Sequence, residues 1–126
     1  MIRYRYNTQL EPPAPFVHLL IRNPADGTEL TNVPAQLDTA ADRTVFPQSV
    51  ADELKLSQIG SMLIGGLGGI IYTLPTYVAV IGVHDLPPTP IKIVTSADEH
   101  WILLGRDVLN RLRFTLDGPQ AALEIG

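Results

Sequence analysis

Prolines and glycines divide this chain into short apolar segments, and this division limits what the chain can fold into. The 126 residues include 11 prolines and 10 glycines, and both residue types interrupt helices and central strands. The apolar stretches between them have the length and the β-branched composition of strands. The sequence therefore predicts an all-β fold with many turns and few helical segments.

The first half of the chain predicts one hairpin followed by a short helix. Strands over residues 16–21 and 33–37 flank a turn over 23–27 that contains Asn, Pro, Asp and Gly. The second strand delivers Asp38 at its end. Pro47 then occupies a position that the first turn of a helix tolerates, and apolar residues continue at helical spacing as far as residue 56.

The second half predicts two more hairpins, a buried strand and a second helix. The loop over 84–90 contains three prolines, too many for a strand ladder. Gly105 interrupts the chain after the buried strand, and a helix start follows it. The expected strands span 76–83, 91–95, 101–104, 114–116 and 122–125, and the expected helix spans 107–112.

Length, charge and composition exclude several classes of function. We expect residues 1–126 to form a single domain, since the chain is too short for two of comparable size. The formal charge is −4 and the basic residues are scattered, so no nucleic-acid partner is expected. There is no Cys, and the three His lack ligand partners at useful spacing. We therefore expect no disulfide, no metal and no other cofactor.

The sequence also indicates that the protein does not associate with a membrane. Its longest apolar runs, such as residues 77–83, are far shorter than a bilayer span. The polar start of the sequence lacks the apolar region of a signal peptide. We therefore expect a soluble, cytoplasmic protein.

Asp38 opens the first segment that indicates chemistry. It stands at a strand end and is followed by three small residues and a second acid, Asp42. A carboxylate that is exposed beside apolar chain is a candidate for acid–base work. An ordinary Asp turn gives the same local pattern, so this segment alone leaves both interpretations open.

The second segment, residues 62–72, is a β-type apolar run interrupted by two glycine pairs around Leu67. The pattern predicts a hairpin whose tip adopts positive φ and serves as a mobile lid. An ordinary glycine turn is the alternative. Phosphate binding is not expected, because no Lys-Ser/Thr and no helix signal follow the glycines.

The third segment, residues 102–109, is an apolar strand, then Gly105, then a charged pair that opens a helix. This order places Arg106 at the edge of the core. A solvated charge at a helix start is the alternative interpretation.

In this order, the three segments resemble the retropepsin family, the single-domain aspartic proteases of retroviruses and their cellular and bacterial relatives. The resemblance covers residues 16–116. Residues 37–45 resemble the catalytic Asp-Thr/Ser-Gly loop, the glycine-rich segment resembles the flap, and residues 103–109 resemble the hydrophobic-Gly-Arg segment with its helix. The resemblance implies a closed, mostly antiparallel β barrel with a flap hairpin and one or two short helices, assembled as a homodimer.

The activity that this resemblance implies is that of an aspartic endopeptidase. Water activation on this route needs two facing carboxyls that cannot both ionise. The chain has one loop of the Asp-Thr-Ala type and is too short for the two lobes of a pepsin-like enzyme. A second copy of the chain would therefore supply the second Asp38. The resemblance assigns the catalytic loop to Asp38, Thr39 and Ala40, with Thr39 bracing the two loops across the dimer.

The resemblance also assigns residues that bind an extended peptide or protein substrate. Asp42 would bind the substrate backbone and form an ion pair with Arg106, a structural residue. The flap would cover the peptide through backbone hydrogen bonds. Apolar pocket walls would come from Ile64, Leu67 and Leu103. The flap itself would comprise Gly65, Gly66, Leu67, Gly68 and Gly69.

Two departures from the family pattern matter. Ala40 stands where the usual pattern has Gly, and it costs about 1 kcal/mol if the backbone there needs positive φ. This feature favours an alternative function, a retropepsin-fold dimer that binds peptides or acts as a scaffold without cleaving them. The termini also differ from those of the viral enzymes, so either the strand-like pattern over residues 2–6 or the hairpin over 114–125 could build the dimer interface.

Overall fold

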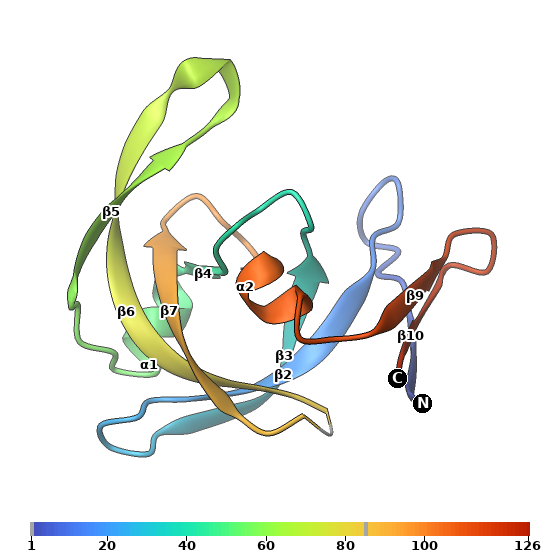
Figure 1. Cartoon of the computed structure of the whole chain (residues 1–126), viewed down its shortest axis with the longest axis horizontal. Coiled ribbons are helices and arrows are strands. Elements are labelled where there is room, and N and C mark those ends of the chain that lie inside the picture. The colour runs from blue at the N-terminus through green and yellow to red at the C-terminus, as the bar shows by residue number, and fades with distance from the viewer. Residues whose placement is uncertain (1, 85) are drawn as a thin grey trace.

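The computed structural model describes residues 2–84 and 86–126, and in this part of the chain strands predominate (Figure 1). Asp85, which falls in the predicted loop over 84–90, lies outside the described residues. The strands are β1 (Ile2–Arg5), β2 (Phe16–Arg22), β3 (Glu29–Leu37), β4 (Val45–Pro47), β5 (Gly60–Gly65), β6 (Ile71–Val83), β7 (Thr89–Ser96), β8 (Ile102–Leu104), β9 (Phe114–Asp117) and β10 (Ala122–Ile125). The helices are α1 (Gln48–Glu53) and α2 (Arg106–Leu109), and Leu67–Gly69 forms one 3-10 turn, η1.

Six of these strands close into a barrel. Their order is β2-β3-β8-β4-β7-β6, and β6 returns to pair with β2 from Leu19↔Val83 to Arg22↔Val80. The β3–β8 and β4–β7 pairs are parallel, and the other pairs are antiparallel. The predicted all-β, closed and mostly antiparallel barrel with two short helices is confirmed.

Alternating apolar residues build the barrel core. On β2, Val17, Leu19 and Ile21 point inward, with at most 1% of their surface exposed, as expected of a strand with one buried face. A buried Asn links the turn after β2 to the end of helix α1: the Asn23 side chain donates to the carbonyls of Leu54 and Lys55, each at 3.0 Å. The turn over 23–27 therefore also holds the end of helix α1.

Several predicted boundaries were wrong: β3 begins at Glu29 and not at residue 33, and α1 ends at Glu53 and not at residue 56. The second helix, α2, begins at Arg106 and ends at Leu109, because single turn bonds such as Leu112 N to Leu109 O replace the helical pattern afterwards. Strand β7 begins at Thr89, so Pro90, which was assigned to the loop, pairs with Val80. A proline lacks the N–H donor but is compatible with extended backbone near the start of a strand.

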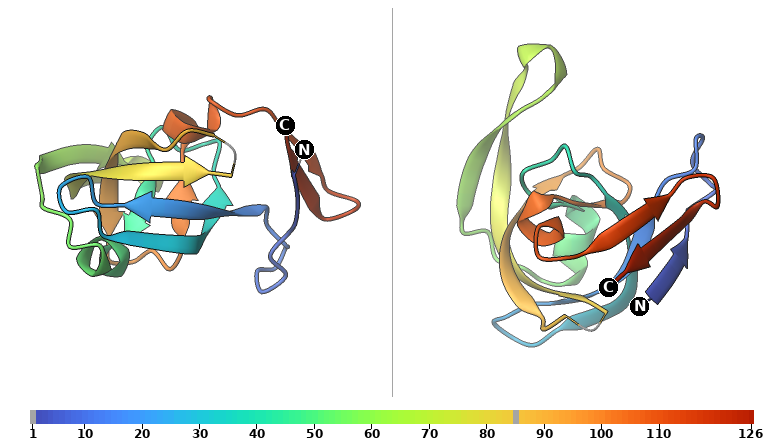
Figure 2. Two further views of the ribbon diagram at one scale, coloured as in Figure 1. Left: turned by 90° about the horizontal axis from the view of Figure 1, so that it is seen from below. Right: turned by 45° about the vertical axis from the view of Figure 1, so that its right-hand side comes forward.

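The terminal strands form a separate three-stranded sheet beside the barrel, in the order β1-β10-β9 (Figure 2). Strand β1 pairs with β10 from Ile2↔Ile125 to Arg5↔Ala122, and Arg3 Nη1 lies 3.3 Å from Glu124 Oε1. The two segments that the sequence offered for the dimer interface are therefore partners within one chain. None of the helices in the described residues is long and apolar enough to cross a membrane.

Tyr4 on β1 is expected to make the terminal sheet sensitive to alkaline pH. Burial raises the pKa of its phenol above the ordinary value, which is about 10. The stabilisation from the neutral phenol is complete below the unfolded-state pKa and is lost as pH rises through the folded-state pKa. Urea unfolding between about pH 8 and pH 11 should therefore show a loss of stability that is smaller in Tyr4→Phe. Tyr72→Phe, at an exposed ring, should keep the wild-type pH dependence.

Candidate active site

Asp38 follows strand β3 directly and is held by two hydrogen bonds. Its backbone N donates to Leu104 O at 2.9 Å, which continues the parallel β3–β8 pairing by one residue. Its Oδ1 accepts from Ala40 N at 3.2 Å. The side chain is half-buried. The strand end and the turn that follows it therefore fix the position of this carboxylate.

The start of helix α2 binds the loop that follows Asp38. Arg106 N donates to Ala41 O at 2.8 Å, and Arg106 Nη1 donates to Thr39 O at 2.8 Å. Thr39 itself is exposed. Arg106 is therefore a structural link between the helix and the loop, through backbone carbonyls.

The predicted ion pair between Asp42 and Arg106 was wrong. Within residues 2–84 and 86–126, the ion pairs are Arg3–Glu124 and Arg22–Glu29. The guanidinium of Arg106 reaches the Thr39 carbonyl instead, and Asp42 is exposed. The loop is already hydrogen-bonded to the helix start, so its Thr39 carbonyl is a fixed acceptor for the guanidinium. An exposed ion pair would contribute little to stability.

Thr44 and Asp107 form a second link, which the sequence analysis missed. Thr44 is fully buried, and its Oγ1 donates to Asp107 Oδ1 at 2.7 Å while its N donates to Asp107 Oδ2 at 2.9 Å. Gly105 N donates to Thr44 Oγ1 at 3.2 Å. The sequence signal for this link was Asp107, an acid in the first turn of a helix that follows a buried strand. A carboxylate at such a position needs a nearby hydrogen-bond donor.

Thr44→Val is expected to destabilise the fold by about 2 kcal/mol, because it keeps the shape but leaves Gly105 N and the Asp107 carboxylate short of partners. Urea unfolding at fixed protein concentration measures this. Thr115→Val, at an exposed position on β9, is the matched control and should change stability by less than about 0.5 kcal/mol. Equal stability of the two variants would show that the buried link contributes nothing.

Ala40 does not carry the strain that its departure from the family pattern suggested. In the described part of the chain, the non-glycine residues with positive φ are Asn32, Lys55, His84 and Ala121. Ala40 is not among them, and it is exposed. Its methyl group therefore imposes no left-handed backbone on the loop that follows Asp38.

The glycine-rich segment forms the predicted flap hairpin. Strands β5 and β6 pair from Gly60↔Thr76 to Gly65↔Ile71, and the hairpin projects beyond the barrel (Figure 1). Gly68 and Gly69 have φ of 74° and 75°, so the predicted positive φ at the tip is confirmed. Leu67 at the tip is 97% exposed.

A cleft of about 460 Å³ lies under this flap. Of the predicted substrate-binding residues, Ile64, Gly65 and Gly66 line it within one chain. Leu67, Gly68 and Gly69 form the tip instead. Leu103 lies on β8 opposite Val45, a residue that does line the cleft.

The other wall of the cleft was not predicted. It comes from the end of β7 at Ser96 and from the turn that follows it, residues 97–99. Asp98 and Glu99 place two acids there. Val45 opens strand β4 directly after the loop over 38–44, but no residue of that loop, Asp38 included, lines the cleft within one chain. The lining residues are Val45, Ile64, Gly65, Gly66, Tyr72, Leu74, Ser96, Ala97, Asp98 and Glu99.

Comparison with solved structures defines the class of fold. No protein-family model and no curated protein matches the sequence. The EIAV protease, a retroviral enzyme solved in complex with the inhibitor HBY-793, is 22% identical with a TM-score of 0.57, over 86% of this chain and 93% of the other. A retropepsin-like aspartic protease from Rickettsia conorii is 16% identical with a TM-score of 0.58, over 97% of this chain and 95% of the other.

These similarities show that the chain has the retropepsin fold. The resemblance that the sequence motifs predicted is therefore confirmed at the level of the fold. Sequence identity this low supports the fold alone, and the chemistry must be argued from the residues of this chain.

Proposed function

We propose that the chain is an aspartic endopeptidase that works as a homodimer, in which Asp38 of each protomer contributes one carboxyl to a shared site. The observation that supports this most is the position of Asp38 in the retropepsin fold. The carboxylate is half-buried and fixed at the end of β3. It is close in sequence to Val45, which lines the cleft under the flap.

The mechanism follows from two carboxyls that share one proton, since two like charges at close range cannot both ionise. The ionised carboxylate accepts a proton from water as the water oxygen attacks the peptide carbonyl carbon. The protonated carboxyl donates its proton to the carbonyl oxygen. The C–N bond then breaks as the carboxyl that accepted the proton from water passes it to the leaving nitrogen, and the other carboxylate takes a proton back from the tetrahedral diol.

An extended peptide with apolar side chains is the substrate that this cleft supports best. The flap strands offer backbone groups for a peptide that adds to them as a further strand. Ile64, Tyr72 and Leu74 give the cleft an apolar wall. The exposed Thr39 is free to brace the two loops across the dimer, and Asp42 to bind the substrate backbone.

Cleavage of a diverse peptide library at several pH values tests the proposal. We expect cleavage between apolar residues that is faster at mildly acidic than at alkaline pH, because raising the pH removes the shared proton. Mass spectrometry of the products gives the sites and the rates. A rate that is flat from mildly acidic to alkaline pH would contradict the shared-proton mechanism, and a folded dimer that binds peptides without cleaving them would favour the peptide-binding alternative.

A further inference from the structure

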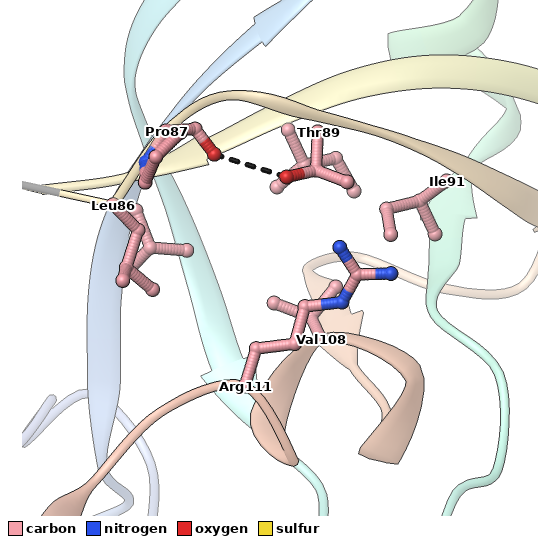
Figure 3. Close-up of a pocket in the computed structure, with 8 residues that line it drawn as sticks. Leu86, Pro87, Thr89, Ile91, Val108 and Arg111 are labelled. Atoms are coloured by element: carbon pink, nitrogen blue, oxygen red, sulfur yellow. Dashed lines mark hydrogen bonds between the residues drawn. The ribbon is translucent and has the colours of Figure 1, made fainter.

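A second cavity lies away from the loop that follows Asp38, between helix α2 and strands β6 and β7 (Figure 3). Its volume is about 140 Å³, and its walls come from β6, the loop before β7, β7 itself and the end of α2. Leu86, Ile91 and Val108 make the lining mainly apolar. Nothing in the proposed peptidase mechanism uses this cavity.

Arg111 gives the cavity one charged group. In Figure 3 its guanidinium extends over Val108 toward Thr89 and Ile91, into the cavity. Within residues 2–84 and 86–126, the Arg111 side chain has no ion pair and no hydrogen bond. Its five N–H groups are therefore available to a ligand, in a fork geometry that suits a carboxylate.

The other polar group in the cavity does not compete for an anion. Thr89 Oγ1 donates its hydrogen to Pro87 O at 3.0 Å. An anion in the cavity therefore finds its donors on Arg111. Arg111 is an exposed residue, so its attraction for an anion rests on charge-assisted hydrogen bonds and not on a low dielectric.

We propose that this cavity binds a small aliphatic carboxylate, with its hydrocarbon tail between Ile91 and Val108 and its carboxylate on the Arg111 guanidinium. The volume limits the tail length, since an apolar cavity of about 150 Å³ accommodates a molecule of about six carbons. Free aliphatic acids and the carboxyl-terminal residue of a peptide share this chemistry. Helix α2 carries Val108 at the cavity and Arg106 at the catalytic loop, so a bound ligand contacts the helix that holds the loop.

NMR titration of the full chain as its Asp38→Asn variant tests this without depending on peptidase activity. The probes are hexanoate, hexan-1-ol and hexylammonium, which share a tail, and N-acetylleucine, which carries a peptide-type terminal carboxylate. We expect saturable shifts of the Ile91 and Val108 methyls with hexanoate at a Kd on the order of 1 mM, and binding at least about tenfold weaker for the alcohol and the amine. Binding of N-acetylleucine as well would extend the site to peptide termini, and its absence would restrict the site to free acids.

Arg111→Gln should weaken hexanoate about tenfold and leave hexan-1-ol unchanged. Arg113→Gln removes a neighbouring basic residue that does not line this cavity, so it should not alter hexanoate binding. Three results would overturn the proposal: shifts that do not saturate or do not centre on this cavity, equal affinity for all three head groups, or unchanged hexanoate binding by Arg111→Gln.

Discussion

Asp38→Asn is expected to lower kcat/KM for every cleaved peptide by about 10³- to 10⁴-fold, near the upper end of what positioned acid–base groups contribute. The amide cannot accept a proton from water. It keeps the size of the carboxylate, and its oxygen can still accept from Ala40 N, the one hydrogen bond that the Asp38 side chain makes in the described residues. The fold should therefore survive, which thermal unfolding checks.

The control for this variant is Glu53→Gln, which neutralises an exposed acid on helix α1 and should leave kcat/KM unchanged. Peptide cleavage by Asp38→Asn at the wild-type rate would rule out the Asp38 mechanism. Equal losses in both variants would show that the overall charge, and not this carboxylate, sets the rate.

Mixing the two chains separates a shared site from two independent ones. If each active unit needs Asp38 from both protomers, an equal mixture of wild type and Asp38→Asn retains about one quarter of the wild-type dimers after random exchange. Activity per total chain should then fall to about a quarter, whereas independent sites would retain about half. Activity per chain should also fall on dilution as the dimer dissociates.

Local signals in the sequence were sufficient for the hairpins and the flap. The residue types in the turn over 23–27 and in the glycine pairs around Leu67 predict the backbone conformation of these segments, because φ preferences act within a few residues. The structure confirms both, with positive φ at Gly27, Gly68 and Gly69. Asp38 was placed at a strand end by the same local argument.

Pairings between distant segments were beyond this kind of reasoning. The β2–β6 contact that closes the barrel, the parallel β3–β8 pair and the β1–β10 terminal pair join residues far apart in the chain. Alternating burial says that a strand has a buried face but not which strand lies beside it. For the same reason the cleft wall at Asp98 and Glu99 was not foreseen.

Polar contacts were the least predictable part of the candidate site. The family resemblance implied that Asp42 pairs with Arg106, but the guanidinium binds the Thr39 carbonyl. The sequence assigned Thr44 no role of its own, but it is buried and bonded to Asp107. Backbone carbonyls are invisible in a sequence as acceptors, and a buried hydroxyl is recognised only once its neighbours are known.

Gly105→Ala should have the largest effect on stability, because Gly105 is packed against the backbone of the loop over 38–44. Its φ of −84° is open to any residue, so glycine is not required there for its conformation. A methyl group at this position would lie 2.5 Å from Arg43 C and 2.6 Å from Arg43 O. These are backbone atoms and cannot move aside as a flexible side chain would.

Relief of that overlap must move the loop away from helix α2. The movement strains the Gly105 N to Thr44 Oγ1 and Arg106 N to Ala41 O bonds, so we expect a destabilisation of about 3 kcal/mol and a fall in Tm of about 10 °C. Gly118→Ala is the control, since a methyl there meets no atom within 4 Å. If Gly105→Ala unfolds at the wild-type temperature, the loop and the helix are not tightly packed. If it folds at lower temperature but does not cleave peptides, the packing also positions Asp38.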